Sequence, residues 1–247
     1  MEFAYMETEG RPRIGVVDRT YRCRTLCTSL PPVDALLGGL EPGTITFIDS
    51  SDRMVFDLVN LYCFNAVTEM HEQVIWIDGG NSVNPYELSA ICKRYRVDPE
   101  EVLHNITVSR AFTAYQMSTL IEDMLDPEVR RIGTGLVVIS CFPDLFQDAD
   151  MNWAESLQLM RRAMGKLRQL TDENELVTVV TNYGLSKMLT KKGLRPLLYD
   201  SADRVVRVEG RGTWVKLVLP KEGVGTLYRP VPRNQTTLDE YGGEVDG

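Results

Sequence analysis

The sequence has no long apolar run: none of its 247 residues belongs to a stretch of the roughly 18 apolar residues that a membrane-spanning helix requires. Its first residues carry no basic region followed by an apolar core, which excludes a secretory signal peptide. Five cysteines in so long a chain are too few for a disulfide framework. We therefore expect a cytoplasmic protein with reduced thiols and no membrane partner.

Metal ligands are scarce as well. The chain has two histidines, His71 and His104, and its closest cysteine pair, Cys23 and Cys27, has no further soft ligands at suitable spacing. No metal site and no cofactor are expected. Hydrophobic residues make up 43% of the chain and charged residues 25%, which is typical of a globular protein with a full core.

Glycine and lysine are missing from the polar turn between Ile48 and Val55. The apolar run Thr44–Ile48, a polar turn and the amphipathic stretch Val55–Val67 have the order of a strand, a phosphate-binding loop and a helix. Such a loop needs glycines, a lysine and a Ser or Thr. Here three carboxylates stand in or beside the turn: Asp49, Asp52 and Asp57. A carboxylate about 4 Å from a phosphate oxygen costs about 4 kcal/mol at an effective dielectric near 20, so triphosphate binding is disfavoured.

Two interpretations of this turn remain open. The start of a helix attracts anions, and Ser50, Ser51 or Asp52 can cap it, with Asp52 adding permanent negative charge. The chain then supplies the anion that a nucleotide would have supplied. The alternative is an ordinary capped helix that never had a ligand.

The net charge of −8 is unevenly distributed. Residues 187–233 hold eleven Lys or Arg against four Asp or Glu, residues 1–186 hold sixteen against twenty-seven, and residues 234–247 hold four acids and no base. A basic block on an acidic body favours a localised anionic partner, although a solvated face of alternating strands would have the same composition.

Hydrophobic patterning predicts alternating strands and helices. The predicted strands are 44–48, 74–78, 106–109, 136–139 and 177–180, and the predicted helices are 33–37, 55–67, 85–95, 116–125 and 153–170. Beyond Tyr183, alternating valines and leucines with Gly210–Gly212 at a turn predict antiparallel ribbons. The fold class is α/β, a doubly wound, mostly parallel sheet with a C-terminal antiparallel β extension. We expect an N-terminal arm (1–30), one core domain (31–233) and a flexible acidic tail (234–247).

Five segments in this order resemble the RecA/RadA recombinase superfamily, nearest its archaeal and eukaryotic branch and the paralogues of that branch. They are Val33–Thr46, Val102–Met117, Leu136–Ile139, Val179–Asn182, and Arg204 followed by Gly210–Gly212. The resemblance covers roughly residues 30–232 and implies a RecA-like core.

The same resemblance implies that the catalytic positions have changed. Phe56 stands at the P-loop lysine, Asp57 at its Ser or Thr, and Ser50 and Val55 at glycines. Ser140 replaces the aspartate of the magnesium-binding strand, Gly80 falls near the glutamate that activates water, and Tyr183 replaces the glutamine that senses the γ-phosphate. Phosphoryl transfer depends on positioning and electrostatic stabilisation by such groups, so we expect a pseudo-ATPase rather than an enzyme.

The family's second DNA-binding loop corresponds to residues between Thr181 and Ser201. Within it, residues 184–195 hold four cations and no acid: Lys187, Lys191, Lys192 and Arg195. Lysine and arginine bind phosphates independently of sequence, so the resemblance implies single-stranded DNA contact here. Residues 184–195 contain no aromatic side chain for base stacking, and a solvated basic loop is the alternative.

Two functions of different classes follow. The first is a non-catalytic RecA/RadA-like paralogue that assists DNA recombination and repair by binding single-stranded DNA, by docking on a catalytic RecA-family protein, or by self-association. The second is a regulatory protein-protein interaction module that binds neither DNA nor nucleotide. Residual nucleotide binding through a rearranged loop is a third interpretation.

Overall fold

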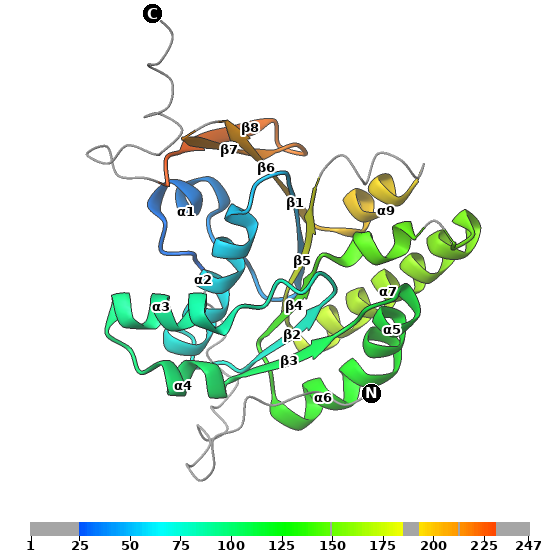
Figure 1. The fold of residues 1–247 in the computed structure, drawn as a ribbon, viewed down its shortest axis with the longest axis horizontal. Helices are drawn as coiled ribbons and strands as arrows, with labels where there is room; N and C mark the ends of the chain where they lie inside the picture. The colour runs from blue at the N-terminus through cyan, green and yellow to red at the C-terminus, as the bar shows by residue number, and fades with distance from the viewer. Residues whose placement is uncertain (1–24, 149, 185–192, 212, 231–247) are drawn as a thin grey trace, which may run out of the picture.

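The computed structural model describes residues 25–148, 150–184, 193–211 and 213–230 (Figure 1). A single mixed sheet of eight strands runs through this part of the chain. Its strands are β1 (Thr44–Ser50), β2 (Val74–Asp78), β3 (Ile106–Arg110), β4 (Leu136–Ser140), β5 (Val177–Tyr183), β6 (Arg204–Arg211), β7 (Trp214–Leu219) and β8 (Val224–Tyr228). Their spatial order is β3-β2-β4-β5-β1-β6-β7-β8.

The first six strands of that order are parallel, and β7 and β8 continue antiparallel to β6. This is the RecA-like, doubly wound α/β fold predicted above. The central parallel strands β2 and β4 are buried along their whole length, because helices cover both of their faces. In β7 every second residue is buried, the pattern of a sheet covered on one face.

Helices form the two outer layers. On one side lie α1 (Pro31–Leu37), α2 (Met54–Thr68), α3 (Pro85–Tyr95) and α4 (Pro99–His104), and on the other lie α5 (Ala114–Thr119), α6 (Leu125–Ile132), α7 (Trp153–Asn174) and α9 (Leu194–Ser201) (Figure 1). Each layer has its own apolar core against the sheet. The α2 side includes Trp76, Val138 and Val206, and the α7 side includes Phe47, Ile77 and Ile139.

Three helical features differ from the predictions. The helix predicted at 116–125 is longer and contains a π-helical stretch, Leu120–Met124, just before Pro127, whose missing N–H removes a helical hydrogen bond. The short helix α4 and a 3-10 helix at Phe142–Gln147 were not predicted. Helix α9 occupies the end of the segment that was predicted to be a loop.

The folded core begins before residue 31. Leu26 pairs with Leu40 and is 1% exposed, and the Asp34 carboxylate accepts bonds from the backbone N–H and hydroxyl of Thr28. Pro31 opens α1 rather than ending the arm, because proline suits the first turn of a helix. The predicted strand near Ile14–Val17, most of the arm and the acidic tail lie outside the described residues.

Candidate nucleotide and nucleic-acid site

The carboxyl ends of the parallel strands gather the predicted site residues at one edge of the sheet. Asp49 is in register with Asn182 and Ser50 with Tyr183, while Asp78 is in register with Ser140. The turn after β1 leads directly into α2 at the same edge (Figure 1). In doubly wound sheets this edge is where ligands bind.

The turn after β1 is closed by its own polar groups. The Ser50 hydroxyl donates to the backbone carbonyl of Asp52 (2.7 Å) and accepts from the Asp52 N–H (3.0 Å). The Asp52 carboxylate accepts the backbone N–H of Met54 at the start of α2 (2.8 Å). Among the three predicted caps, Asp52 is therefore the one that places an anion at the helix start, where a phosphate would bind in an active loop.

Phe56 and Tyr183 fill the space beside that turn. Their ring centroids lie 5.1 Å apart with the planes tilted by 56°, and both rings pack on the α2-side core. The resemblance assigns these positions to the phosphate-binding lysine and the γ-phosphate sensor, so two groups that would contact phosphate are replaced by an apolar contact between aromatic rings. Val55, at a predicted glycine position, is fully buried.

Asp57 faces acidic neighbours. Its pKa is raised, first because burial removes water from the carboxyl and then because Glu87 and Asp52 place negative charge nearby. A Ser or Thr at this position would hold magnesium in an active loop. Here the position adds to a local excess of negative charge.

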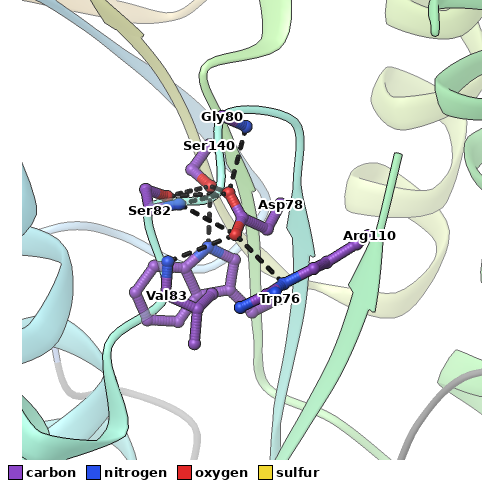
Figure 2. A network of polar contacts seen from close by, with 7 residues as sticks. All are labelled: Trp76, Asp78, Gly80, Ser82, Val83, Arg110 and Ser140. Carbon is purple, nitrogen blue, oxygen red and sulfur yellow. Dashed lines mark hydrogen bonds and ion pairs between the residues drawn. The ribbon is translucent and has the colours of Figure 1, made fainter. Parts of the chain in front are cut away.

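A separate polar cluster surrounds the carboxylate of Asp78, at the end of β2 (Figure 2). The Asp78 side chain is fully buried. Three backbone N–H groups donate to it, at 2.9 to 3.2 Å: those of Gly80, Ser82 and Val83. The Arg110 guanidinium lies 3.7 Å from Oδ2. The carboxylate thus organises the turn that follows β2.

Ser140 belongs to this cluster. Its hydroxyl donates to Asp78 Oδ1 (3.0 Å), contacts the Ser82 hydroxyl (2.8 Å) and accepts from the indole N–H of Trp76 (2.9 Å), as Figure 2 shows. At this position the resemblance predicts a magnesium-binding aspartate. The serine hydroxyl is instead used in an internal network, and an aspartate here would lie against the Asp78 carboxylate.

Gly80 has no room for a side chain. A Cβ atom on Gly80 would lie 2.4 Å from the Cys141 Sγ and 2.6 Å from the Cys141 Cβ. The chain therefore closes the position near which active relatives are expected to carry the water-activating glutamate.

A third cluster was not predicted. The Asp49 carboxylate, fully buried at the end of β1, accepts from the amide of Asn182 (2.9 Å), the guanidinium of Arg195 (2.9 Å) and the hydroxyl of Tyr199 (2.9 Å). Burial alone would lower the pKa of Arg195, but its contacts with Tyr199 and Asp49 outweigh burial and raise it. Arg195 therefore stays charged within the cluster.

This cluster bears on the predicted DNA contact of Arg195. Its guanidinium points inward to Asp49 and Tyr199, and its side chain is 22% exposed, so in this structure it is engaged within the protein. The other three predicted DNA-binding residues, Lys187, Lys191 and Lys192, lie outside the described residues.

An aromatic side chain lies against Gly193, near the downstream end of the basic segment (residues 184–195). Trp153, at the start of α7, is 46% exposed, and its ring would be 3.6 Å from a Cβ on Gly193. The sequence pattern missed this residue because it stands some forty positions before the segment, beyond any local motif. An exposed tryptophan beside cations is one signal that could have identified it.

The part of the chain that the structure describes contains neither a cluster of metal ligands nor a membrane-spanning helix. No group of three or more His, Cys, Asp or Glu side chains there could hold a metal ion. No helix there is both long and apolar enough to cross a bilayer. Among the described cysteines, Cys27, Cys63, Cys92 and Cys141 are not joined in disulfide bonds.

Comparisons with known proteins agree with the fold. The family model of Rad51 matches residues 24–194, more than half of the chain. The chain is similar to the DNA repair protein Rad51 homolog of Drosophila melanogaster, with 26% identity over 175 residues, 64% of this chain and 49% of that protein. It is also similar to the DNA repair protein rhp51 of Schizosaccharomyces pombe, with 28% identity over 167 residues, 64% of this chain and 46% of that protein.

A meiotic relative is matched over a shorter region. The meiotic recombination protein DMC1/LIM15 homolog of Mus musculus is 27% identical over 114 residues, which cover 44% of this chain and 34% of that protein. The chain thus spans about half the length, or less, of the curated relatives that it matches.

Proposed function

Because the chain belongs to the Rad51 family, we propose that it assists DNA recombination and repair as a non-catalytic paralogue, a pseudo-ATPase that contacts single-stranded DNA without a nucleotide cycle of its own. One observation carries the proposal. At the positions that the resemblance assigns to nucleotide, magnesium and catalytic water, the chain makes contacts of its own: Phe56 packs on Tyr183, the Ser140 hydroxyl donates to Asp78, and Cys141 lies where a side chain on Gly80 would go.

The loss is electrostatic as well as steric. A nucleotide-binding loop supplies positive charge and several backbone N–H groups to the phosphates. Here Asp52 already holds the N–H at the start of α2, and Asp57 and Glu87 add negative charge beside it. A triphosphate would have to displace one carboxylate and approach two more, which disfavours binding before any catalytic step.

The case for DNA combines charge with an aromatic surface. The basic segment carries three lysines whose predicted role is phosphate contact, and Trp153 lies beside its downstream end. Stacking of a base on an aromatic ring contributes about 1–3 kcal/mol and tolerates any sequence. A basic segment with one adjacent indole fits weak, sequence-independent binding of a single strand.

Filter binding of single-stranded DNA by the whole chain, with and without Mg·ATP, tests the proposal. We expect retention that is the same in both conditions. Quenching of tryptophan fluorescence by an oligonucleotide adds a local readout, because Trp76 is buried while Trp153 is exposed. The variant Trp153→Phe should lose most of the quenching, whereas Trp214→Phe should keep it. Retention that requires ATP would contradict the pseudo-ATPase assignment.

A second function, docking on a catalytic Rad51-family protein without DNA contact, is favoured by one surface. Phe112 and Tyr115, just after the edge strand β3, are 72% and 52% exposed. Exposed aromatic residues are enriched in protein interfaces. Co-purification with an ATP-competent partner that is lost in Phe112→Ala, together with no retention of DNA, would favour this function over the first.

A further inference from the structure

Within the described chain, the outer side of α3 is not covered by another element. Leu88 and Cys92, on the inner side of this helix, are fully buried. Tyr86, on the outer side, is 85% exposed, and Ala90, one turn further along, is also exposed. Figure 1 shows α3 at the margin of the molecule, where a partner can reach it. An exposed aromatic ring is a frequent feature of protein interfaces.

The side chains on this outer side are complementary to themselves when the helix is reversed. Because a helix has 3.6 residues per turn, side chains seven positions apart stand in one column. Glu87 and Arg94 form one column on the outer side of α3. Tyr86 and Lys93 form the other column, and Ala90 lies midway between the two. Turning such a face end over end places the acid and the ring of one copy opposite the cations of the other.

We propose that the outer side of α3 is the interface of a twofold homodimer, in which the α3 helices of two copies pack antiparallel across Ala90. Glu87 then pairs with the partner's Arg94, and the Tyr86 ring with the partner's Lys93. In a twofold interface each of these contacts occurs twice. The first is a charge-assisted contact and the second is a cation–π contact. This association needs neither DNA nor nucleotide and so goes beyond the proposed function.

The charges on α3 are not neutralised within the described chain, which favours a second copy as the partner. Neither Lys93 nor Arg94 forms an ion pair with another described residue. Glu87 accepts a hydrogen bond from the neutral amide of Asn60 (3.1 Å), and after burial its charge is the next cause of the raised pKa of Asp57. A reversed copy brings a cation to this acid and an acid to these cations, whereas a polyanion would be repelled by Glu87.

The size of α3 sets the expected strength of the dimer. The helix has eleven residues and is about 16 Å long at 1.5 Å per residue. Two helices of this length bury less than the roughly 1,200 Å² at the lower end of stable interfaces. We therefore expect a weak dimer, with a dissociation constant of about 10–100 µM.

Sedimentation velocity of the whole chain measures this association over a range from about tenfold below to about tenfold above the expected dissociation constant. The wild-type chain should change from monomer to dimer across that range. Arg94→Glu places acids opposite each other in both halves of the interface and should weaken the dimer at least about tenfold. Arg161→Glu makes the same change of charge at an exposed position of α7 and is the matched control. It should associate like the wild type.

Exchange of charge between the two positions tests the pairing itself. Glu87→Arg alone brings arginines together and should also prevent association. An equimolar mixture of Glu87→Arg and Arg94→Glu should form a heterodimer, because each cation then meets an acid. The double variant Glu87→Arg/Arg94→Glu should associate within about threefold of the wild type, since the two changes act on one contact. Ala90→Arg is a further disrupting variant, and it leaves the bond between Glu87 and Asn60 in place.

The results that would overturn the inference are distinct from a failure of the proposed function. A wild-type chain that stays monomeric at every concentration would overturn it, as would a dimer that Arg94→Glu and Arg161→Glu weaken equally. A mixture of the two exchange variants that remains monomeric would exclude the antiparallel pairing. The same series repeated with an oligothymidylate should give the same dissociation constants, so the absence of DNA binding would leave the dimer unaffected.

Discussion

Replacing Gly80 by alanine is a direct test of whether this position can hold a side chain. The new Cβ would lie 2.4 Å from Sγ and 2.6 Å from Cβ of Cys141, both well inside the normal contact distance between heavy atoms. Rotation of the Cys141 side chain could move Sγ away, but it cannot move the Cys141 Cβ. The backbone must shift, and we expect Gly80→Ala to lower the free energy of unfolding by about 1–3 kcal/mol, the usual cost of overpacking.

The companion variant Cys141→Gly removes both obstructing atoms. Cys141 has a φ of 51°, in the left-handed region that favours glycine, so this change also relieves backbone strain of about 1 kcal/mol. In the Cys141→Gly background, Gly80→Ala should cost less than about 0.5 kcal/mol, because non-additivity of this kind is expected of residues in direct contact.

Urea denaturation followed by circular dichroism measures these differences through the transition midpoint at constant slope. Gly165→Ala is the control, since Gly165 lies inside α7 with nothing within 4 Å of an added Cβ. It should raise stability by about 0.5–1 kcal/mol, because alanine is the better helix former. An unchanged midpoint in Gly80→Ala, or an equal loss in both backgrounds, would refute the steric argument.

The remaining predictions concern charge and ligands. With Arg195 bound to Asp49, three lysines (Lys187, Lys191 and Lys192) are left to neutralise phosphates, so the slope of log K for single-stranded DNA against log salt should be about −2. A slope near −3, which is expected of four cations, would show that Arg195 also contacts a phosphate. The raised pKa of Asp57 means that the folded state holds a proton that the unfolded state releases, so stability falls as pH rises above the ordinary value of 3.8. Asp57→Asn should therefore be the more stable protein at pH 7, with the difference from the wild type disappearing in acid denaturation profiles below that value. Mg·ATP should leave the melting temperature of the wild-type chain unchanged in a thermal-shift titration, and an upward shift that grows with nucleotide concentration would show that the site still binds.

The fold was largely predictable because its signals are local. Continuous apolar runs predicted β2 and β4 within a residue of their observed bounds, and Pro85 marked the start of α3. No helix was predicted at α9, because the resemblance placed a DNA-binding loop between Thr181 and Ser201. The spacing of Leu194 and Leu198, four residues apart and both buried, was the pattern that could have predicted the helix.

The sequence by itself determined that the turn between β1 and α2 contains no glycine and no lysine. Missing glycines and a missing lysine are visible without coordinates, because a loop that cradles phosphates depends on residue types at fixed local spacing. It also determined that Asp52 stands where it can cap α2.

Only the tertiary structure decided what took the place of those groups. Arg195 was predicted to contact DNA because it is one of four cations in the acid-free segment 184–195, yet its partner Asp49 lies 146 residues earlier. Phe56 meets Tyr183, which lies 127 residues later, and Gly80 lies against Cys141, which lies 61 residues later. Parallel strands bring their carboxyl ends to one edge whatever their separation along the chain, and the buried charges and rings that meet there set each other's partners through contacts that no local pattern contains.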